Sequence, residues 1–450
     1  MRLIFLVLIL SFPIYTDVST NNLKKIQFRL YQCGIDYPKY SSLPIVDSGL
    51  YLAIQKSKNQ NLSKNCLEII EEIEELLLLN NYDKKNSLEF SFISNEEIFL
   101  KDSSNKFFYK ENVSFSHENS LGNINYKINL IKTNDSTYFD DSYIRILTGN
   151  SIITFGRQNL WWSPSDYSSL IISNQSRALP MIMAENNLSI PTKYFGKIRY
   201  KFFLSELEEN RFVPNAKLLG LRIESEIKNN LILGLSRVAQ FGGDGRDADI
   251  NTLLNILIGR DNTGDEDEDP SNQIASVDFK YFFKNRTNIY GQIAGEDEAG
   301  YLPSRTFYNI GSEIQTKNFI DQIVIDYTDT AASGNPNYTY NHFVYKDGYR
   351  YKGVPIGSNI DADSSILNLV LKKDFSFHNN LSIKIFDGKI NTNNSAKNYL
   401  TKDFKAYRGF STEYSVKFQK NMYLRIRYDY YQKHFNDADN QFFLNLTHTF

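Results

Sequence analysis

The side chains best suited to contact a ligand lie in irregular stretches in the middle of the chain. Trp161 and Trp162 are the only tryptophans of the sequence, and they are adjacent. A tryptophan side chain combines a large apolar face with a polar edge. The pair could therefore stack on a ligand, or it could anchor its own loop inside the fold or at a membrane interface.

Charged side chains in the same stretches allow two interpretations. An arginine can bind the carboxylate of a ligand through two parallel hydrogen bonds, and the candidates are Arg177, Arg246, Arg260 and Arg350. The alternative is ion pairing within the protein, for which the expected partners are Asp244, Asp261, Glu296, Asp297 and Glu298. We favour ion pairing for this group, with ligand binding left open.

Metal binding and catalysis find little support. The acidic run from Asp265 to Asp269 could bind calcium through carboxylate oxygens, but it lacks the spacing of a calcium loop, and we interpret it as solvated. The five histidines do not form a motif, and no nucleophile elbow, zinc or phosphate-binding signature is present. We therefore expect no cofactor, no metal and no enzyme.

The elements that must position these side chains are strands. After residue 86 the apolar residues alternate with polar ones, and the clearest case is the run from Met422 to Tyr430. Its apolar side chains would face lipid and its arginines a wet interior, over about nine residues, which suits a tilted membrane strand. A soluble all-β protein is the alternative, but charges recur on the inward faces of several strands.

These patterns predict an all-β transmembrane barrel of about 16–18 antiparallel strands over residues 86–450. Irregular stretches at 156–195, 240–275 and 328–362 are long enough to plug its lumen. The chain ends in alternating apolar residues and a terminal Phe450, which resembles the signal that such barrels present to the barrel assembly machinery. We expect a monomer that contacts outer-membrane lipid.

The residues before the barrel have a different character. Residues 1–20 carry Arg2 and a short apolar run, as a signal peptide does. Residues 21–85 predict a small periplasmic helical segment, with helices near 48–57 and 62–79. Cys33 and Cys66 lie in this segment, and the sequence leaves open whether they form a disulfide or remain as two thiols.

The net charge of -2 offers no basic excess for phosphates, so nucleic acid is not an expected partner. Four stretches instead resemble the Wzi family of capsule-assembly proteins, in order and spacing. They are residues 156–180 (GRQNLWWSPSDYSSLIISNQSRALP), 234–262, 290–313 and 349–364. Ser163 and Ser165 replace two glycines of the family pattern, which affects the expected turn geometry.

This resemblance implies an 18-stranded outer-membrane lectin that binds exported capsular or other surface polysaccharide and retains it at the cell surface. Sugar rings stack on aromatic faces, and their hydroxyls and carboxylates bind carboxylates, amides and arginines. The implied binding residues are Trp161, Trp162, Arg177, Asp244, Arg246, Glu296, Asp297 and Arg350. A porin or sugar-selective channel is the alternative function, and a barrel hydrolase is a third.

Overall fold

The computed structural model describes most of the chain from residue 26 onward. The described residues are 26, 30, 33, 35, 37, 39–44, 49–58, 60, 62–79, 85–95, 100–104, 109–228, 230–249, 252, 271–283, 287–299, 302–316, 319–334, 336–376, 378–433 and 437–450. The expected signal peptide at 1–20 and the acidic run at 265–269 lie outside them.

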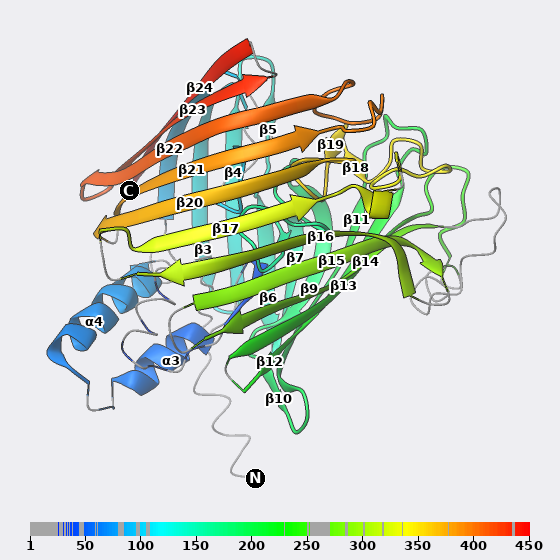
Figure 1. Ribbon diagram of the computed structural model, residues 1–450. Helices are drawn as coiled ribbons and strands as arrows, with labels where there is room; N and C mark the ends of the chain where they lie inside the picture. Colours follow the sequence, from blue (N-terminus) through cyan, green and yellow to red (C-terminus); the bar gives the residue numbers. More distant parts are fainter. Residues whose placement is uncertain are drawn as a thin grey trace, which may run out of the picture.

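One large antiparallel sheet dominates the described structure (Figure 1). Its strands are β2 (Lys85–Ile93), β3 (Glu111–Leu121), β4 (Ile124–Lys132), β5 (Thr137–Tyr138), β6 (Tyr143–Thr148), β7 (Ser151–Gln158), β9 (Leu179–Asn186), β10 (Ile190–Thr192), β11 (Gly196–Glu206), β12 (Lys217–Ile227), β13 (Leu231–Phe241), β14 (Ser271–Phe282), β15 (Thr287–Ala299), β16 (Leu302–Gln315), β17 (Gln322–Asp329), β20 (Ser365–Ser376), β21 (Asn379–Ile390), β22 (Lys405–Gln419), β23 (Met422–Lys433) and β24 (Asp437–Thr449).

The sheet closes on itself, because β2 pairs with β24 as well as with β3. Of its 20 strands, β5 and β10 are short additions of two and three residues. The remaining strands form a closed barrel of 18 antiparallel strands. The structure thus confirms the predicted fold class and the upper end of the predicted strand number.

The side chains of the barrel alternate as the sequence predicted. On β12, Ile223 is half exposed on the outer surface, whereas its neighbours Arg222 and Glu224 are buried in the interior. On β14, Val277 points outward and Asp278 is buried. An apolar outer face with a polar interior is the arrangement that a hydrocarbon surround requires, because lipid cannot hydrogen-bond to charged groups.

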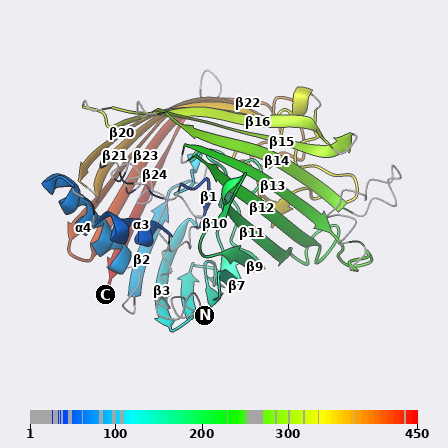
Figure 2. The same ribbon diagram turned by 90° about the horizontal axis from the view of Figure 1, so that it is seen from below.

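The two ends of the barrel differ in their connections. At the short-turn end the strands are joined by turns such as Gly122–Asn123 and Gly149–Asn150, and at the long-loop end by segments such as 159–178 and 330–364. Two helices, α3 (Gly49–Ser57) and α4 (Lys64–Leu79), lie at the short-turn end (Figures 1 and 2). No helix among the described residues is both long and apolar enough to cross a bilayer.

The helical unit has its own small core. Ile54 of α3 packs with Ile70 and Ile73 of α4, and Ile26 and Leu30 join them. The helices match the predicted ranges to within two residues, and Ile70 and Ile73 of α4 are fully buried. Cys33 and Cys66 form a disulfide, which settles the question that the sequence left open.

Residues 39–44, which we call the strap, run from this helical unit into the barrel. Within the strap, β1 (Ser42–Leu43) pairs with β8 (Trp161–Trp162) inside the ring of strands (Figure 2). Arg199 on the barrel wall donates to the carbonyl oxygen of Lys39 at 2.8 Å. The strap therefore connects the helices to the loop that carries both tryptophans.

The barrel wall around the strap carries buried ion pairs, which we call the charged layer. Arg222 donates to both oxygens of Asp278, at 2.7 and 3.0 Å, and to Glu224 at 2.9 Å. Arg222 also donates to the Ser41 hydroxyl of the strap, and that hydroxyl donates to Glu224 at 3.1 Å. The short-turn half of the lumen is thus filled by paired charges and a peptide segment.

Candidate functional site

The long-loop half of the lumen contains an apolar plug built on the tryptophans. Trp162 is fully buried, with its ring centroid 5.5 Å from that of Phe203 on β11. Trp161 is 2% exposed, and its indole N–H donates to the carbonyl oxygen of Ser165 at 2.7 Å. In this conformation both indoles are committed to protein contacts and hold the segment 159–178 inside the barrel.

The segment 159–178 is bonded to the segment 330–364, which also folds inward. The backbone N–H of Ser173 donates to the carbonyl oxygen of Ile356 at 2.8 Å. The hydroxyl of Tyr340 donates to the carbonyl oxygen of Leu170 at 2.8 Å. Within 330–364, the short hairpin of β18 (Arg350–Tyr351) and β19 (Val354–Pro355) contributes to the same apolar cluster. The two segments therefore form one plug.

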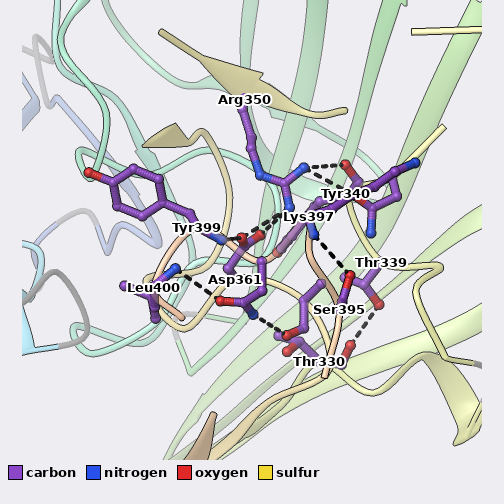
Figure 3. A network of polar contacts seen from close by, with 12 residues as sticks. Thr330, Thr339, Tyr340, Arg350, Asp361, Ser395, Lys397, Tyr399 and Leu400 are labelled. Carbon is purple, nitrogen blue, oxygen red and sulfur yellow. Dashed lines mark hydrogen bonds and ion pairs between the residues drawn. The ribbon is translucent and has the colours of Figure 1, made fainter. Parts of the chain in front are cut away.

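Arg350 ties the plug together from within (Figure 3). Its guanidinium donates to both oxygens of Asp361, at 2.8 and 3.0 Å, and to the carbonyl oxygen of Tyr340 at 3.2 Å. The N–H of Tyr399, from the neighbouring loop 391–404, donates to Asp361 at 2.7 Å. Arg350 is thus paired within the protein, and its partner is Asp361 and not one of the five acidic residues expected from the sequence.

Arg177 makes an equivalent pair at the barrel wall. Its Nε and Nη2 donate to the two oxygens of Asp140, each at 2.8 Å, and the Tyr109 hydroxyl donates to the same carboxylate at 2.6 Å. Burial would lower the pKa of Arg177, but the hydrogen bonds and charge of Asp140 outweigh it and raise the pKa. Ion pairing is again the observed role, and Asp140 was not among the expected partners.

The remaining candidates divide between the plug and the outer surface. Glu296 is buried and accepts a hydrogen bond from the N–H of Tyr340. Asp244 is exposed at the long-loop end, where the side-chain amide of Asn215 donates to it at 3.2 Å. The side chain of Asp297, together with Arg260 and Asp261, lies outside the described residues.

Arg246 lies near the buried ring of Tyr345 at the long-loop end, and exposed aromatic rings lie on the same end of the barrel. Its guanidinium carbon is 5.5 Å from the ring centroid of Tyr345. Phe212 is 58% exposed, and Lys346 lies 4.2 Å from its ring centroid. Phe343 is 43% exposed and stacks on His342. We call Phe212, Asp244, Arg246, Phe343 and Lys346 the outer patch.

Hydrogen bonds between loops hold the outer patch in shape. The N–H of Phe212 donates to Asp347 at 2.6 Å, and Arg211 donates to the carbonyl oxygens of Gly348 and Arg350. The hydroxyl of Tyr345 donates to the carbonyl oxygen of Gly242 at 3.2 Å. Three loops thus present aromatic rings and charges together, an arrangement that can bind flat apolar faces and polar groups of one ligand.

The described residues show no cluster of metal-binding side chains. They contain no group of three or more His, Cys, Asp or Glu side chains that could hold a metal ion. His342, the histidine nearest the outer patch, accepts hydrogen bonds from the N–H groups of Val344 and Tyr345 through Nδ1. That ring therefore caps a turn.

Comparison with known proteins shows which family has this architecture. Residues 74–447 match the family described as capsule assembly protein Wzi. The chain belongs to the Wzi family. A Klebsiella pneumoniae protein described as an uncharacterized 55.8 kDa protein in the cps region is 34% identical over 173 residues. That match covers 36% of this chain and 34% of the relative, so it spans about a third of the relative's length.

The fold agrees with a solved structure of the same family. Escherichia coli Wzi, described as a carbohydrate-binding β-barrel of the outer membrane involved in group 1 capsule assembly, superposes with a TM-score of 0.82. The two are 21% identical, and the likeness covers 95% of this chain and 96% of the E. coli chain. At that identity the likeness establishes the barrel and its topology.

Two of the four Wzi-like stretches, 156–180 and 349–364, contribute to the plug, and a third, 290–313, lies in the barrel wall against it. Gln292 on β15 clamps the segment 159–178, since its side chain donates to the carbonyl oxygen of Trp162 and accepts from the N–H of Leu170, each at 2.9 Å. The Ser165 hydroxyl, at a position where the family pattern has glycine, donates to Asp326 at 2.6 Å. Sequence reasoning missed Asp326 and Gln292, whose partners are more than 100 residues away.

Proposed function

We propose that this Wzi-family protein resides in the outer membrane, binds exported capsular polysaccharide at its long-loop end and helps to retain the capsule. Outer-membrane barrels have short periplasmic turns and longer extracellular loops. The long-loop end with the outer patch would then face the exterior, and the helical unit the periplasm. The description of E. coli Wzi as carbohydrate-binding and the cps-region origin of the Klebsiella relative support this assignment.

The observation that supports the proposal most directly is that the plug, the strap and the charged layer occupy the lumen, beneath an outer patch whose loops are hydrogen-bonded to one another. A transport channel needs a continuous polar path, whereas here the apolar plug lies above the charged layer and the strap. Binding needs a surface whose loops are already ordered, because immobilising loops on binding weakens affinity. The hydrogen bonds among the three loops of the outer patch supply that order.

The candidate residues then take two roles. Asp244 and Arg246 lie on the outer patch, where the rings of Phe212 and Phe343 could stack on the C–H faces of sugars. The candidates inside the barrel would act as positioning residues that hold the plug under this surface. They are the buried Trp161, Trp162, Glu296 and Arg350 and the partly buried Arg177. Asp297 stays a prediction from the sequence.

The test compares exposed phenylalanines at the two ends of the barrel. We expect Phe212→Ala with Phe343→Ala to weaken the binding of purified group 1 capsular polysaccharide about tenfold, through lost ring stacking. The matched control is Phe375→Ala with Phe418→Ala, which removes two exposed rings at the short-turn end. If both variants lost polysaccharide binding equally, the outer patch could not be assigned as the binding surface.

Two further measurements address the alternative functions. A steady open-pore current across a planar bilayer would favour the porin, and we expect none from the intact chain. Release of reducing sugar from the polysaccharide would indicate a hydrolase, whereas we propose binding without turnover. Polysaccharide that fails to bind the intact protein at all would reject the proposed function itself.

A further inference from the structure

The outer surface of the barrel carries a circle of exposed aromatic rings at the short-turn end. They come from turns and strand ends far apart in the sequence but at one level of the barrel: Tyr194, Phe195, Phe319, Phe375, Phe418 and Phe450. We call them the aromatic rim. Phe319 is 83% exposed and Tyr194 is 76% exposed. Apolar side chains left so far uncovered on a folded protein indicate a partner surface.

The part of the rim at the β10–β11 turn has a defined shape. The N–H of Phe195 donates to the Thr192 hydroxyl at 3.0 Å, and that hydroxyl donates to the carbonyl oxygen of Gly196 at 2.9 Å. Gly196 has φ +68°, and a Cβ there would lie 2.1 Å from the carbonyl oxygen of Glu226. This glycine lets the turn bend closely against β12 and project Tyr194 and Phe195 outward.

Lysines accompany the rings around the rim. Lys193, Lys228 and Lys420 are exposed, and in the described turns of this end they are the exposed charged side chains. The ammonium of Lys193 lies 5.2 Å from the ring centroid of Tyr194. Asp321, on the neighbouring β16–β17 turn, is half buried and bonded to Lys373 and to the N–H of Asp374. The exposed charge of the rim is therefore positive.

The long-loop end differs, because it exposes charges of both signs. Exposed carboxylates lie on its loops and strand ends, among them Glu206, Glu209, Asp244, Asp247 and Asp249, and the exposed lysines of the same end include Lys346, Lys352, Lys397 and Lys402. In the described turns of the short-turn end, by contrast, the exposed charged side chains are all lysines.

We propose that the aromatic rim and its lysines bind the headgroups of anionic phospholipids in the membrane leaflet at the short-turn end. Aromatic rings favour the boundary between hydrocarbon and headgroups. Lysine buries its methylene chain along apolar surface and extends its ammonium to the polar layer. At this boundary Lys193, Lys228 and Lys420 meet lipid phosphates, and basic residues near an anionic leaflet gain electrostatic stabilisation from it.

The first test measures lipid selectivity of the full mature chain in nanodiscs. Spin-labelled phosphatidylglycerol is expected to associate with the barrel more strongly than spin-labelled phosphatidylcholine. Replacing the three rim lysines together, as Lys193→Gln, Lys228→Gln and Lys420→Gln, should bring the ratio of the two association constants close to one. The matched control replaces three exposed lysines of the long-loop end, as Lys352→Gln, Lys397→Gln and Lys402→Gln, and should leave the ratio unchanged.

A second measurement locates the contact. Phe195→Trp introduces an indole at the rim, and brominated phosphatidylglycerol should quench it more than brominated phosphatidylcholine does, with Phe212→Trp at the other end as the control. The proposal is overturned if the rim variant keeps the phosphatidylglycerol preference, or if the control variant loses it equally. It is also overturned if the rim lysines change selectivity for lipid A and leave that for phosphatidylglycerol intact.

Discussion

The two halves of the lumen are filled by different chemistry. At the short-turn end the charged layer pairs Arg222 with Asp278 and Glu224 around the strap. At the long-loop end the plug packs Trp162 and Phe203 among aliphatic side chains. Buried ion pairs fix a geometry but contribute little net stability, whereas apolar packing contributes stability directly. We infer that the charged layer specifies where the strap sits, and that the plug stabilises the closed loops.

The largest effect should come from breaking the charged layer on one side only. Arg222→Met leaves the carboxylate of Asp278 buried without its guanidinium partner and leaves Glu224 with Arg199 at 3.9 Å, and it should lower the free energy of unfolding by about 3–5 kcal/mol. Urea-induced unfolding in detergent micelles measures this loss. Adding Asp278→Leu to Arg222→Met should recover part of it, and a double variant as unstable as the single one would contradict the pairing.

A loss of similar or slightly smaller size should follow in the plug. Trp162→Ala removes a fully buried indole and leaves a cavity, for an expected loss of about 3–5 kcal/mol. Trp162→Phe keeps most of the apolar volume and should cost less. Because Trp162 lies on β8, which pairs with β1 of the strap, Trp162→Ala should also speed hydrogen exchange in the strap. A strap that stays fully protected would show that the two halves are independent.

The helical unit provides a third comparison, outside the barrel. Replacing Cys33 and Cys66 by serine opens a loop with a sequence separation of 33 and should destabilise this unit by about 2–4 kcal/mol. Differential scanning calorimetry should show a lower transition for the helical unit with the barrel transition unchanged. A shift of both transitions would mean that the unit and barrel unfold together.

Acid should act on the loop residues 100–104, where Asp102 lies near charged side chains of the barrel wall. Burial alone would raise the pKa of Asp102, but the charges of Arg425 and Lys384 and the hydrogen bonds of Ser104 lower it below the ordinary value of 3.8. A lowered pKa means stability that is present at neutral pH and lost as the pH falls below about 3.8. Limited proteolysis at falling pH should cut this loop, and Asp102→Asn should make it susceptible at every pH.

The smallest effect is expected for an ion pair on the outside of the barrel. Nε and Nη2 of Arg408 both donate to Oδ2 of Asp387, at 2.8 and 2.6 Å, and both side chains are mostly exposed. Arg408→Met should change the free energy of unfolding by less than about 1 kcal/mol. If urea unfolding showed that Arg408→Met lowers the free energy of unfolding as much as Arg222→Met does, burial would not explain why one ion pair matters more than the other.

The sequence predicted the helices and strands better than it predicted which side chains pair with one another. Period-two alternation identified the strands, and the apolar spacing of 62–79 identified α4, because both patterns are local. The partner of Arg177 was missed because Asp140 lies in a separate loop, 37 positions away. The partner of Arg350 was missed although Asp361 is only 11 positions away in the same loop, because an irregular loop has no periodic pattern that signals the contact. The pairing of Ser42 with Trp162 joins residues 120 positions apart, and no local pattern signals such a contact.

The pairing of β2 with β24 also sets the order in which the protein must be assembled. The first and last strands of the ring meet, so the cylinder cannot shut until the whole polypeptide has been delivered. The strap precedes β2 in the chain and ends up enclosed by the finished wall. The strap can therefore take its place before β2 and β24 pair, or later through the short-turn end, because the finished wall leaves no lateral entrance.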